Sequence, residues 1–382
     1  MPRISMILPS ISFLVALLTP SAGSASPGDA TSCGLFRQLS EEYKLNTAGA
    51  ALIRDGRVQW TCFAGEEAPG VQASARTRFN VASITKVIVT EAILMEVDAG
   101  RLDLNESMAP WWIDPDLVND PRHERLTPRM VLTHQTGLPN WRYFAADRRL
   151  NFEHDPGAAY GYSGEGFHYL AAYAARKLAV PFSDIVESNV FEPLGMRSAA
   201  MIAHSEDTRH FARSLDENGV FPGFWCRPGG WCQPEGFASA AGGLRVTVGD
   251  LATFLIEAAD GLGYGPELLA QRSTVHTPLT GEDADMPCSG DNVTDLPSQG
   301  YGLGWRVLSC EDEPLLFHGG SDWAELAIAA ISPLSRNGFI VLLNAPNIHG
   351  ARAMPELLRI IAPDSPLVAH YEQRRDRAEA GS

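Results

Sequence analysis

A serine and a lysine three positions apart, Ser83 and Lys86, lie in the apolar stretch FNVASITKVIVTEAILMEV at residues 79–97. Lysine is rare in this chain, because only three of its 30 basic residues are lysines and all the others are arginines. Arginine stays protonated in proteins, whereas a buried lysine can lose its proton and act as a base. The lysine at position 86 therefore indicates chemistry rather than a plain positive charge.

The spacing of this pair suits nucleophilic catalysis. Helix positions i and i+3 share a face, so the hydroxyl and the amine can come within hydrogen-bond distance. Apolar neighbours would lower the pKa of Lys86, and an uncharged lysine can remove the proton of a serine. The helix amino terminus favours an alkoxide on Ser83 and turns its N–H toward an oxyanion. The competing interpretation is that Ser83 only caps the helix while Lys86 extends to solvent.

A tyrosine further along the chain could take part in the same chemistry. Tyr162 lies in PGAAYGYSGEGFHYL, a glycine-rich loop that runs into an expected helix. A tyrosine beside a cationic lysine has a lowered pKa and can pass protons to a leaving group. Taken alone, Tyr162 is by default a packing residue.

A third candidate stretch, FHGGSDW, places His318, Gly319 and Gly320 at an expected strand edge. Glycines allow a substrate to approach the backbone of a strand closely. The N–H of Ser321 could then complete an oxyanion hole with the N–H of Ser83. Taken alone, this stretch is a turn.

The elements expected around these residues mix strands and helices. Two alternating runs in residues 47–65 surround Asp55-Gly56, which is typical of a hairpin. Residues from about 87 to 235 are rich in helices and loops. Four β-rich runs follow: YGLGWRVLSC, PLLFHGGSDW, ELAIAAISPL and GFIVLLN. The stretch ARAMPELLRIIA after them is expected to be a helix. We therefore expect a mixed α/β fold: an antiparallel sheet flanked by helices and built from both chain ends, with an inserted helical lobe.

The expected division of the chain follows from this order. The segments are a signal peptide (1–25), an α/β sheet domain (31–90 and 235–365), a helical lobe (91–234) and a disordered tail (366–382). The first segment has a basic start, an apolar run and small residues near Ala25, which is typical of secretion and predicts a secreted or periplasmic protein. A membrane anchor is the alternative, but prolines interrupt the run and it is shorter than the roughly 20 residues that span a bilayer.

Composition and charge argue against a nucleic-acid partner. The chain has 382 residues, of which 45% are hydrophobic and 20% charged, as in an ordinary soluble globular protein. Its formal charge of −16 argues against a nucleic-acid partner, and no cluster of basic residues makes a local exception. The expected partner is a small-molecule ester, amide or peptide substrate, without a stable membrane anchor.

The cysteines predict disulfides rather than a metal site. There are six, an even number that suits an oxidising compartment: 33, 62, 226, 232, 288 and 310. Pairing of nearest neighbours is the simplest arrangement, and CRPGGWC is typical of a turn closed by a disulfide. Paired CxxC units for zinc are absent, and His204 and His210 have no neighbouring ligand cluster. No metal and no cofactor is expected.

The order Ser-x-x-Lys, then Tyr162, then His-Gly-Gly resembles the serine beta-lactamase and penicillin-binding protein superfamily, in particular its class C beta-lactamase and family VIII esterase branch. LTPRMVLTHQTGLPNW, VFEPLGM and ASAAGGLRVTVGDLATFL also resemble stretches of that family. The likeness covers residues from about 40 to 345. An α/β-hydrolase elbow is not supported, because the nearest stretch, GYSGE, ends in glutamate instead of glycine.

The resemblance implies acyl transfer through a covalent acyl-serine in a cleft between sheet domain and helical lobe. By position, Ser83 is the nucleophile, Lys86 its base and Tyr162 the proton relay, while Ser83 and Ser321 supply the oxyanion N–H groups. The remaining candidate substrate-binding residues are Gly164, His318, Gly319 and Gly320.

Two departures from the family pattern bear on the substrate. Tyr-Ser-Gly at 162–164 replaces the Tyr-x-Asn of many beta-lactamases, so the amide side chain that would bind the substrate is missing. His318-Gly319-Gly320 replaces Lys-Thr-Gly, and a histidine is mostly neutral at pH 7. We therefore expect a serine hydrolase acting on a carboxylic ester or small amide. The alternatives are a D-amino-acid or cell-wall peptidase or weak beta-lactamase, and a non-catalytic binding or sensor protein.

Three tryptophans are candidate walls of the cleft. Trp111, Trp112 and Trp141 lie in expected loops of the helical lobe, where they could line a site for an apolar acyl group. Packing between the two parts of the fold explains them equally well.

Overall fold

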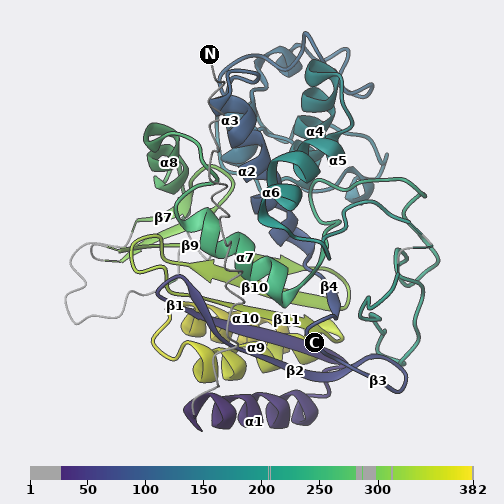
Figure 1. Cartoon of the computed structure of the whole chain (residues 1–382). Helices are drawn as coiled ribbons and strands as arrows, with labels where there is room; N and C mark the ends of the chain where they lie inside the picture. Colours follow the sequence, from purple (N-terminus) through teal and green to yellow (C-terminus); the bar gives the residue numbers. More distant parts are fainter. Residues whose placement is uncertain are drawn as a thin grey trace, which may run out of the picture.

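The computed structural model describes residues 27–204, 206, 208–280, 286, 298–310 and 313–380. Its centre is an antiparallel sheet of nine described strands in the order β3-β2-β1-β11-β10-β9-β8-β7-β6 (Figure 1). These strands are β1 (Thr47–Arg54), β2 (Arg57–Ala68), β3 (Val71–Gln72), β6 (Thr277–Pro278), β7 (Ser298–Tyr301), β8 (Arg306–Cys310), β9 (Glu313–Ser321), β10 (Glu325–Ile331) and β11 (Gly338–Asn344). A separate pair joins β4 (Arg78–Asn80) to β5 (Arg245–Thr247).

The two ends of the chain meet in this sheet. β1 pairs with β11, with Thr47 opposite Asn344. β1 and β2 form the predicted hairpin, and its turn residues Asp55 and Gly56 have φ values of 49° and 69°. Such positive angles at both turn positions match the twist of the strands and are typical of an Asp-Gly turn. Pairing of β1 with β11 therefore closes a sheet built from both chain ends.

Helices cover both faces of the sheet and build the lobe above it (Figure 1). α9 (Asn347–Ile361), α10 (Leu367–Ala380) and α1 (Pro27–Glu42) lie on one side, and α7 (Val248–Ala259) lies on the other. The lobe contains α2 (Thr85–Asp98), α3 (Pro128–Leu132), α4 (Gly164–Leu178), α5 (Phe182–Val186), a π-helical turn (Glu187–Phe191) and α6 (Glu192–Leu194), and α8 (Pro266–Ser273) lies nearby.

The strands alternate their side chains between two cores. In β11, Phe339, Val341 and Leu343 belong to the core shared with α1 and α9, whereas Ile340 and Leu342 belong to the core shared with α2 and α7. This period of two buries both faces of the strand. The predicted fold class, an antiparallel sheet from both chain ends with an inserted helical lobe, is confirmed. The residue limits given for its parts stay a prediction, and the expected signal peptide lies outside the described residues.

Two of the expected disulfides are present. Cys33–Cys62 joins α1 to β2, and Cys226–Cys232 closes the short turn. Cys288, the expected partner of Cys310, lies outside the described residues. In the described part of the chain, no helix is both long and apolar enough to cross a membrane.

The prediction of a disordered tail at 366–382 is wrong for most of its length. Residues 367–380 form α10, with Leu367, His370 and Tyr371 buried against the sheet domain. The charged run QRRDR makes this helix difficult to predict from the sequence. Only one narrow apolar side of the helix packs against the rest of the protein. Such a side is set by tertiary contact rather than by a strong periodic pattern.

Tyr371 should therefore matter for stability. Its side chain is only 2% exposed. We expect Tyr371→Ala to lower the free energy of unfolding by about 3 kcal/mol, since it leaves a cavity under β9. Urea unfolding would measure this, with Arg377→Ala on the exposed side of α10 as the control. A Tyr371→Ala midpoint equal to that of the control would mean that α10 adds nothing to the fold.

Candidate active site

The backbone before α2 holds Ser83 in a strained turn. Ser83 lies in a 3₁₀ turn, Ala82–Ile84, that leads directly into α2. Ala82 has a φ of 44°, which residues other than glycine seldom adopt. Its N–H donates to Oδ1 of Asn80 at 3.0 Å, and its carbonyl accepts from the Thr85 hydroxyl at 2.6 Å. These two bonds fix the turn and therefore the position of Ser83.

Lys86 lies below Ser83 and is fully buried, with 0% of its surface exposed. Its Nζ donates to Ser83 Oγ at 3.2 Å and to the carbonyl of Ala241 at 2.7 Å. Among the described residues, no salt bridge involves Lys86. Burial lowers the pKa of Lys86 to about 7. At neutral pH a large share of Lys86 is therefore an uncharged amine in hydrogen-bond contact with a hydroxyl.

The helix that carries Lys86 is firmly anchored further along. Glu91 is completely buried on α2, and its carboxylate accepts from Arg272 at 3.1 Å, from Trp305 at 2.8 Å and from the Tyr264 hydroxyl at 2.8 Å. Breaking such a paired buried charge is costly. The register of α2, and with it the direction of Lys86, is held by these contacts.

Tyr162 lies against both residues of the pair. Its ring centroid is 4.8 Å from Lys86 Nζ, and its phenol hydrogen-bonds with Ser83. Burial raises the pKa of Tyr162, and the bond to Ser83 offsets only part of this effect. The expectation that a cationic lysine lowers this pKa is wrong, because desolvation of the phenolate dominates. Tyr162 is a protonated phenol at neutral pH and can donate its proton.

His134 belongs to the same cluster, although the sequence analysis did not single it out. Its ring lies 4.4 Å from the Tyr162 ring at an angle of 31°, and its Nδ1 accepts from the Ser163 N–H at 3.1 Å. Burial lowers the pKa of His134 well below its usual value, so the ring is neutral. His134 therefore packs against the Tyr162 ring as a neutral side chain. Its φ of 53° within LTHQTGLP is a feature that no residue pattern reveals.

His318 comes from β9 and faces the same cluster. The side chain is 3% exposed, and burial lowers its pKa to about 3. Nδ1 lies 2.6 Å from the carbonyl of Gly319, so Nδ1 carries the proton and Nε2 has the lone pair. No hydrogen-bond partner for Nε2 is found among the described residues. His318 therefore offers a neutral acceptor rather than a cation.

The glycines beside His318 bring β9 against the Ser83 turn. A Cβ on Gly320 would lie 2.2 Å from the carbonyl oxygen of Val81, two residues before Ser83. Only glycine permits this approach. Ser321 follows at the exposed end of β9, opposite Leu326 in β10. The two segments predicted to supply oxyanion N–H groups are thus packed against each other.

Gly164, a candidate substrate-binding residue, packs against the Trp141 ring. A Cβ there would lie 2.6 Å from the Trp141 ring, so Gly164 makes room for that ring at the start of α4. Contact of Gly164 with a substrate stays a prediction. Of the three tryptophans, Trp141 lies near the site, with its ring 6.0 Å from Lys86 Nζ.

The other two tryptophans are away from this cluster. Trp111 and Trp112 lie against Lys177 and Arg176, at the far end of α4. They therefore line the opposite end of the lobe. The histidines at 204 and 210 each contact a glutamate: His204 contacts Glu235 and His210 contacts Glu67. Across the described ranges, no group of three or more side chains could hold a metal ion.

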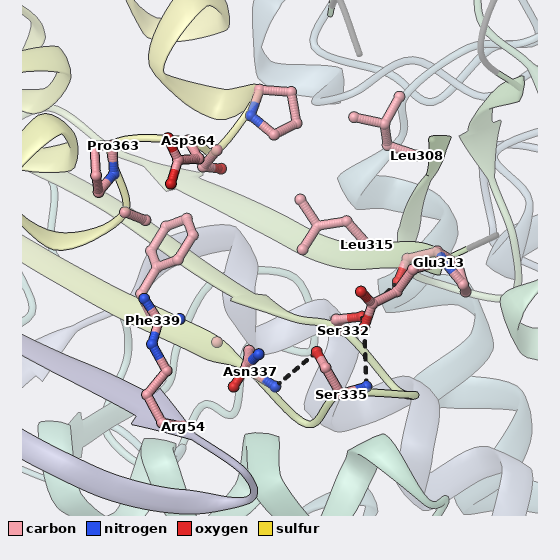
Figure 2. A pocket seen from close by; sticks show the side chains of 15 residues that line it. Arg54, Leu308, Glu313, Leu315, Ser332, Ser335, Asn337, Phe339, Pro363 and Asp364 are labelled. Atoms are coloured by element: carbon pink, nitrogen blue, oxygen red, sulfur yellow. Dashed lines mark hydrogen bonds between the residues drawn. The ribbon is translucent and has the colours of Figure 1, made fainter. Parts of the chain in front are cut away.

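A large cavity lies away from this cluster. It has a volume of about 490 Å³ and is lined by residues of β8, β9, β11 and the loop after α9 (Figure 2). Glu313 in this cavity already accepts hydrogen bonds from Ser332 and Ser335. The hydrogen bonds from Ser332 and Ser335 lower the pKa of Glu313, which makes its carboxylate a weak base, so we place the candidate site at Ser83 on chemistry rather than on volume.

Comparison with known proteins agrees with this geometry. The sequence model of the family described as Beta-lactamase matches residues 34–362. This range covers most of the sheet domain and the whole helical lobe. The chain belongs to the beta-lactamase family.

Individual relatives are distant. Esterase EstB of Burkholderia gladioli is 27% identical over 199 residues, which cover 44% of this chain and 50% of EstB. The D-alanyl-D-alanine-carboxypeptidase/endopeptidase AmpH of Escherichia coli K12 is 22% identical over 231 residues, which cover 55% of this chain and 56% of AmpH. The chain thus spans about half the length of the curated relatives it matches.

A solved structure extends the likeness to nearly the whole fold. The D-amino acid amidase of Ochrobactrum anthropi SV3 superposes with a TM-score of 0.67 at 19% identity, covering 88% of this chain and 98% of the amidase. At this identity the match shows the fold alone.

Proposed function

We propose that this protein is a serine hydrolase that cleaves a carboxylic ester or a small uncharged amide through an acyl-serine intermediate. The observation that carries the proposal is Lys86: a fully buried amine, 3.2 Å from Ser83 Oγ, whose pKa is lowered to about 7. A protein that only binds a ligand has no need of a buried base beside a hydroxyl. The esterase relative supports the ester as the first substrate class.

Acylation follows from this arrangement. Neutral Lys86 removes the hydroxyl proton while Ser83 Oγ bonds to the substrate carbonyl carbon, giving a tetrahedral oxyanion. The N–H groups of Ser83 and Ser321 bind this oxyanion. As it collapses, the bond to the leaving oxygen or nitrogen breaks, and Tyr162 gives that atom its proton. The proton on Lys86 then restores Tyr162, so the products are an acyl-serine and a free alcohol or amine.

Deacylation runs through the same groups in reverse. Lys86 and Tyr162 take a proton from water while its oxygen bonds to the acyl carbon. The bond to Ser83 Oγ then breaks, and the proton returns to the serine. The carboxylic acid leaves, and the enzyme regains its starting protonation.

The charge of the site favours an uncharged substrate. His318 stands where the family resemblance implies a lysine, and burial lowers the pKa of His318 to about 3, so it stays neutral. A carboxylate beside His318 would lose its water without gaining a cationic partner. Beta-lactams and peptides with a free carboxyl end are therefore poorer candidates than neutral esters and amides.

A second candidate is cleavage of D-amino-acid amides or cell-wall peptides. The AmpH relative and the amidase fold both favour it. Secretion or a periplasmic location, which the first 25 residues and the two disulfides support, would place the enzyme near cell-wall peptides. A neutral His318 is compatible with an internal peptide bond or an amide, although not with strong binding of a terminal carboxylate.

The experiment that tests the nucleophile is intact mass spectrometry after treatment with a fluorophosphonate, on the mature protein and on Ser83→Ala. We expect one adduct on the wild type and none on the variant. Turnover of neutral esters, D-amino-acid amides and beta-lactams would then separate the substrate classes. Adducts on both proteins would assign the wrong serine, and an adduct on neither would favour a binding protein.

A further inference from the structure

A small hairpin closed by a disulfide lies beside the candidate site. Cys226 and Cys232 are bonded to each other, and the backbone between them folds back with Arg227 N–H donating to the Trp231 carbonyl at 2.8 Å. Gly229 and Gly230 make the turn with φ values of 90° and 87°. A disulfide and a tight turn leave this segment few alternative conformations. Arg227 is therefore presented in a fixed direction.

The guanidinium of Arg227 connects two separate parts of the fold. Its Nη2 donates to the Asp322 carboxylate at 2.9 Å, in the turn between β9 and β10. Its Nη1 donates to the Tyr143 hydroxyl at 3.4 Å, in the helical lobe. Only the planar fork of an arginine offers two nitrogens to two partners in this way. We call this set of three side chains the Arg227 bridge.

Asp322 and Tyr143, the two partners of Arg227, each adjoin a residue near the catalytic pair. Asp322 directly follows Ser321, the proposed oxyanion residue. Tyr143 is stacked on Trp141, with ring centroids 5.7 Å apart and an angle of 17°, and the Trp141 ring lies 6.0 Å from Lys86 Nζ. The bridge thus joins the lobe to the end of β9 on one side of Ser83.

A confined space lies between the bridge and the Ser83 turn. Its lining includes Asn80 and Gly242 next to that turn, Trp225, Arg227 and Trp231 of the hairpin, and Asp322 between β9 and β10. Its volume is about 20 Å³, which holds about one water molecule. Asn80 lies three residues before Ser83, so an acyl chain on Ser83 that extended past Asn80 would meet the Arg227 side of this space.

We propose that Arg227 determines specificity by closing the acyl side of the site, so that this enzyme prefers short acyl groups of about acetyl size. The inference rests on the proposed function, because it assigns the acyl chain of an ester to this space. Loss of the guanidinium opens the space between Tyr143 and Asp322. Longer acyl chains then gain room, and their reaction speeds up relative to that of acetate.

The test compares 4-nitrophenyl acetate, butyrate and octanoate as substrates of the disulfide-bonded protein. For the wild type, kcat/KM should fall at least tenfold from acetate to octanoate. In Arg227→Ala the ratio of octanoate to acetate kcat/KM should rise at least tenfold. Arg227→Lys should raise the ratio as well, because a single ammonium cannot reach both partners. Arg352→Ala, which breaks an exposed pair with Glu379 on α10, should leave the ratio unchanged.

Asp322→Asn keeps the shape of the side chain that Arg227 contacts but removes its negative charge. It tests the Arg227 bridge if Arg227→Ala fails to fold. It should raise the same ratio by a smaller factor. A wild type that prefers octanoate, or a ratio that stays constant in the bridge variants, overturns the inference while fluorophosphonate labelling of Ser83 still upholds the hydrolase. Absence of both labelling and ester turnover overturns the proposed function and the inference with it.

Discussion

Lys86→Arg is expected to abolish acylation of Ser83, with kcat/KM lowered at least about a hundredfold. The substitution keeps a positive charge but removes the base, because a guanidinium stays protonated at any pH at which the protein is folded. It also places a bulkier group in a completely buried position. The measurement is the rate of fluorophosphonate labelling together with turnover of a neutral ester.

Lys86→Met separates the base from the charge and the packing. Methionine is close to lysine in length and needs no hydrogen-bond partner, so this variant should fold well and still fail to acylate. Acylation at the wild-type rate in either variant would show that Lys86 is not the base. Loss of acylation in the arginine variant alone would point to crowding instead.

The pH dependence follows from the pKa of about 7 at Lys86. Acylation needs the neutral amine, so kcat/KM should rise about tenfold per pH unit below pH 7 and level off above it. His318 should add no step near neutrality, since its pKa is lowered to about 3. A profile that falls between pH 6 and 8 would contradict the neutral amine as base.

The lowered pKa of Lys86 should also make the free energy of unfolding depend on pH. Its pKa falls from 10.5 to about 7 on burial, so the unfolded chain binds the extra proton between these values. Wild-type stability therefore rises with pH from 7 to 10.5, by about 1.4 kcal/mol per unit relative to Lys86→Met, and the difference is constant below pH 7. Urea unfolding of both proteins at pH 7 and pH 9 measures this, independently of catalysis.

Local patterns in the sequence predicted much of this arrangement. The i, i+3 spacing of Ser83 and Lys86 is a property of one helix turn, and the hairpin at Asp55-Gly56 is a property of two residues. The resemblance supplied the order of the more distant segments. These features depend on few neighbours, which is why a single sequence reveals them.

Features that depend on tertiary contact were missed. Ala241, whose carbonyl binds Lys86, is 155 residues away from it, and no spacing rule connects the two. The raised pKa of Tyr162 depends on burial by several segments, and His134 supports that ring only once the lobe is folded. The helix at 367–380 has no clear sequence pattern, because only a few of its residues are buried and their positions depend on the surface against which they pack.

Gly320→Ala should be nearly as damaging as loss of the base, although it removes no functional group. Its Cβ would lie 2.2 Å from the Val81 carbonyl oxygen, and a backbone atom cannot rotate away as a side chain can. Val81 adjoins Ala82, whose φ of 44° leaves the turn little freedom. Either β9 or the Ser83 turn must therefore move by a substantial fraction of an ångström.

A shift of that size separates Ser83 from Ser321 at the proposed oxyanion hole, where a misplacement of about 1 Å can cost a hundredfold in rate. We therefore expect kcat/KM of Gly320→Ala to fall by about that factor, and stability to fall by about 1 to 3 kcal/mol. Gly319→Ala is the matched control, because the nearest atom to its Cβ would be the Tyr371 hydroxyl, at 3.2 Å, on a side chain that can adjust. The next is the Ala327 carbonyl oxygen, at an ordinary contact distance of 3.7 Å. Equal losses in the two variants would show that the close contact of β9 with Val81 does not set the catalytic geometry.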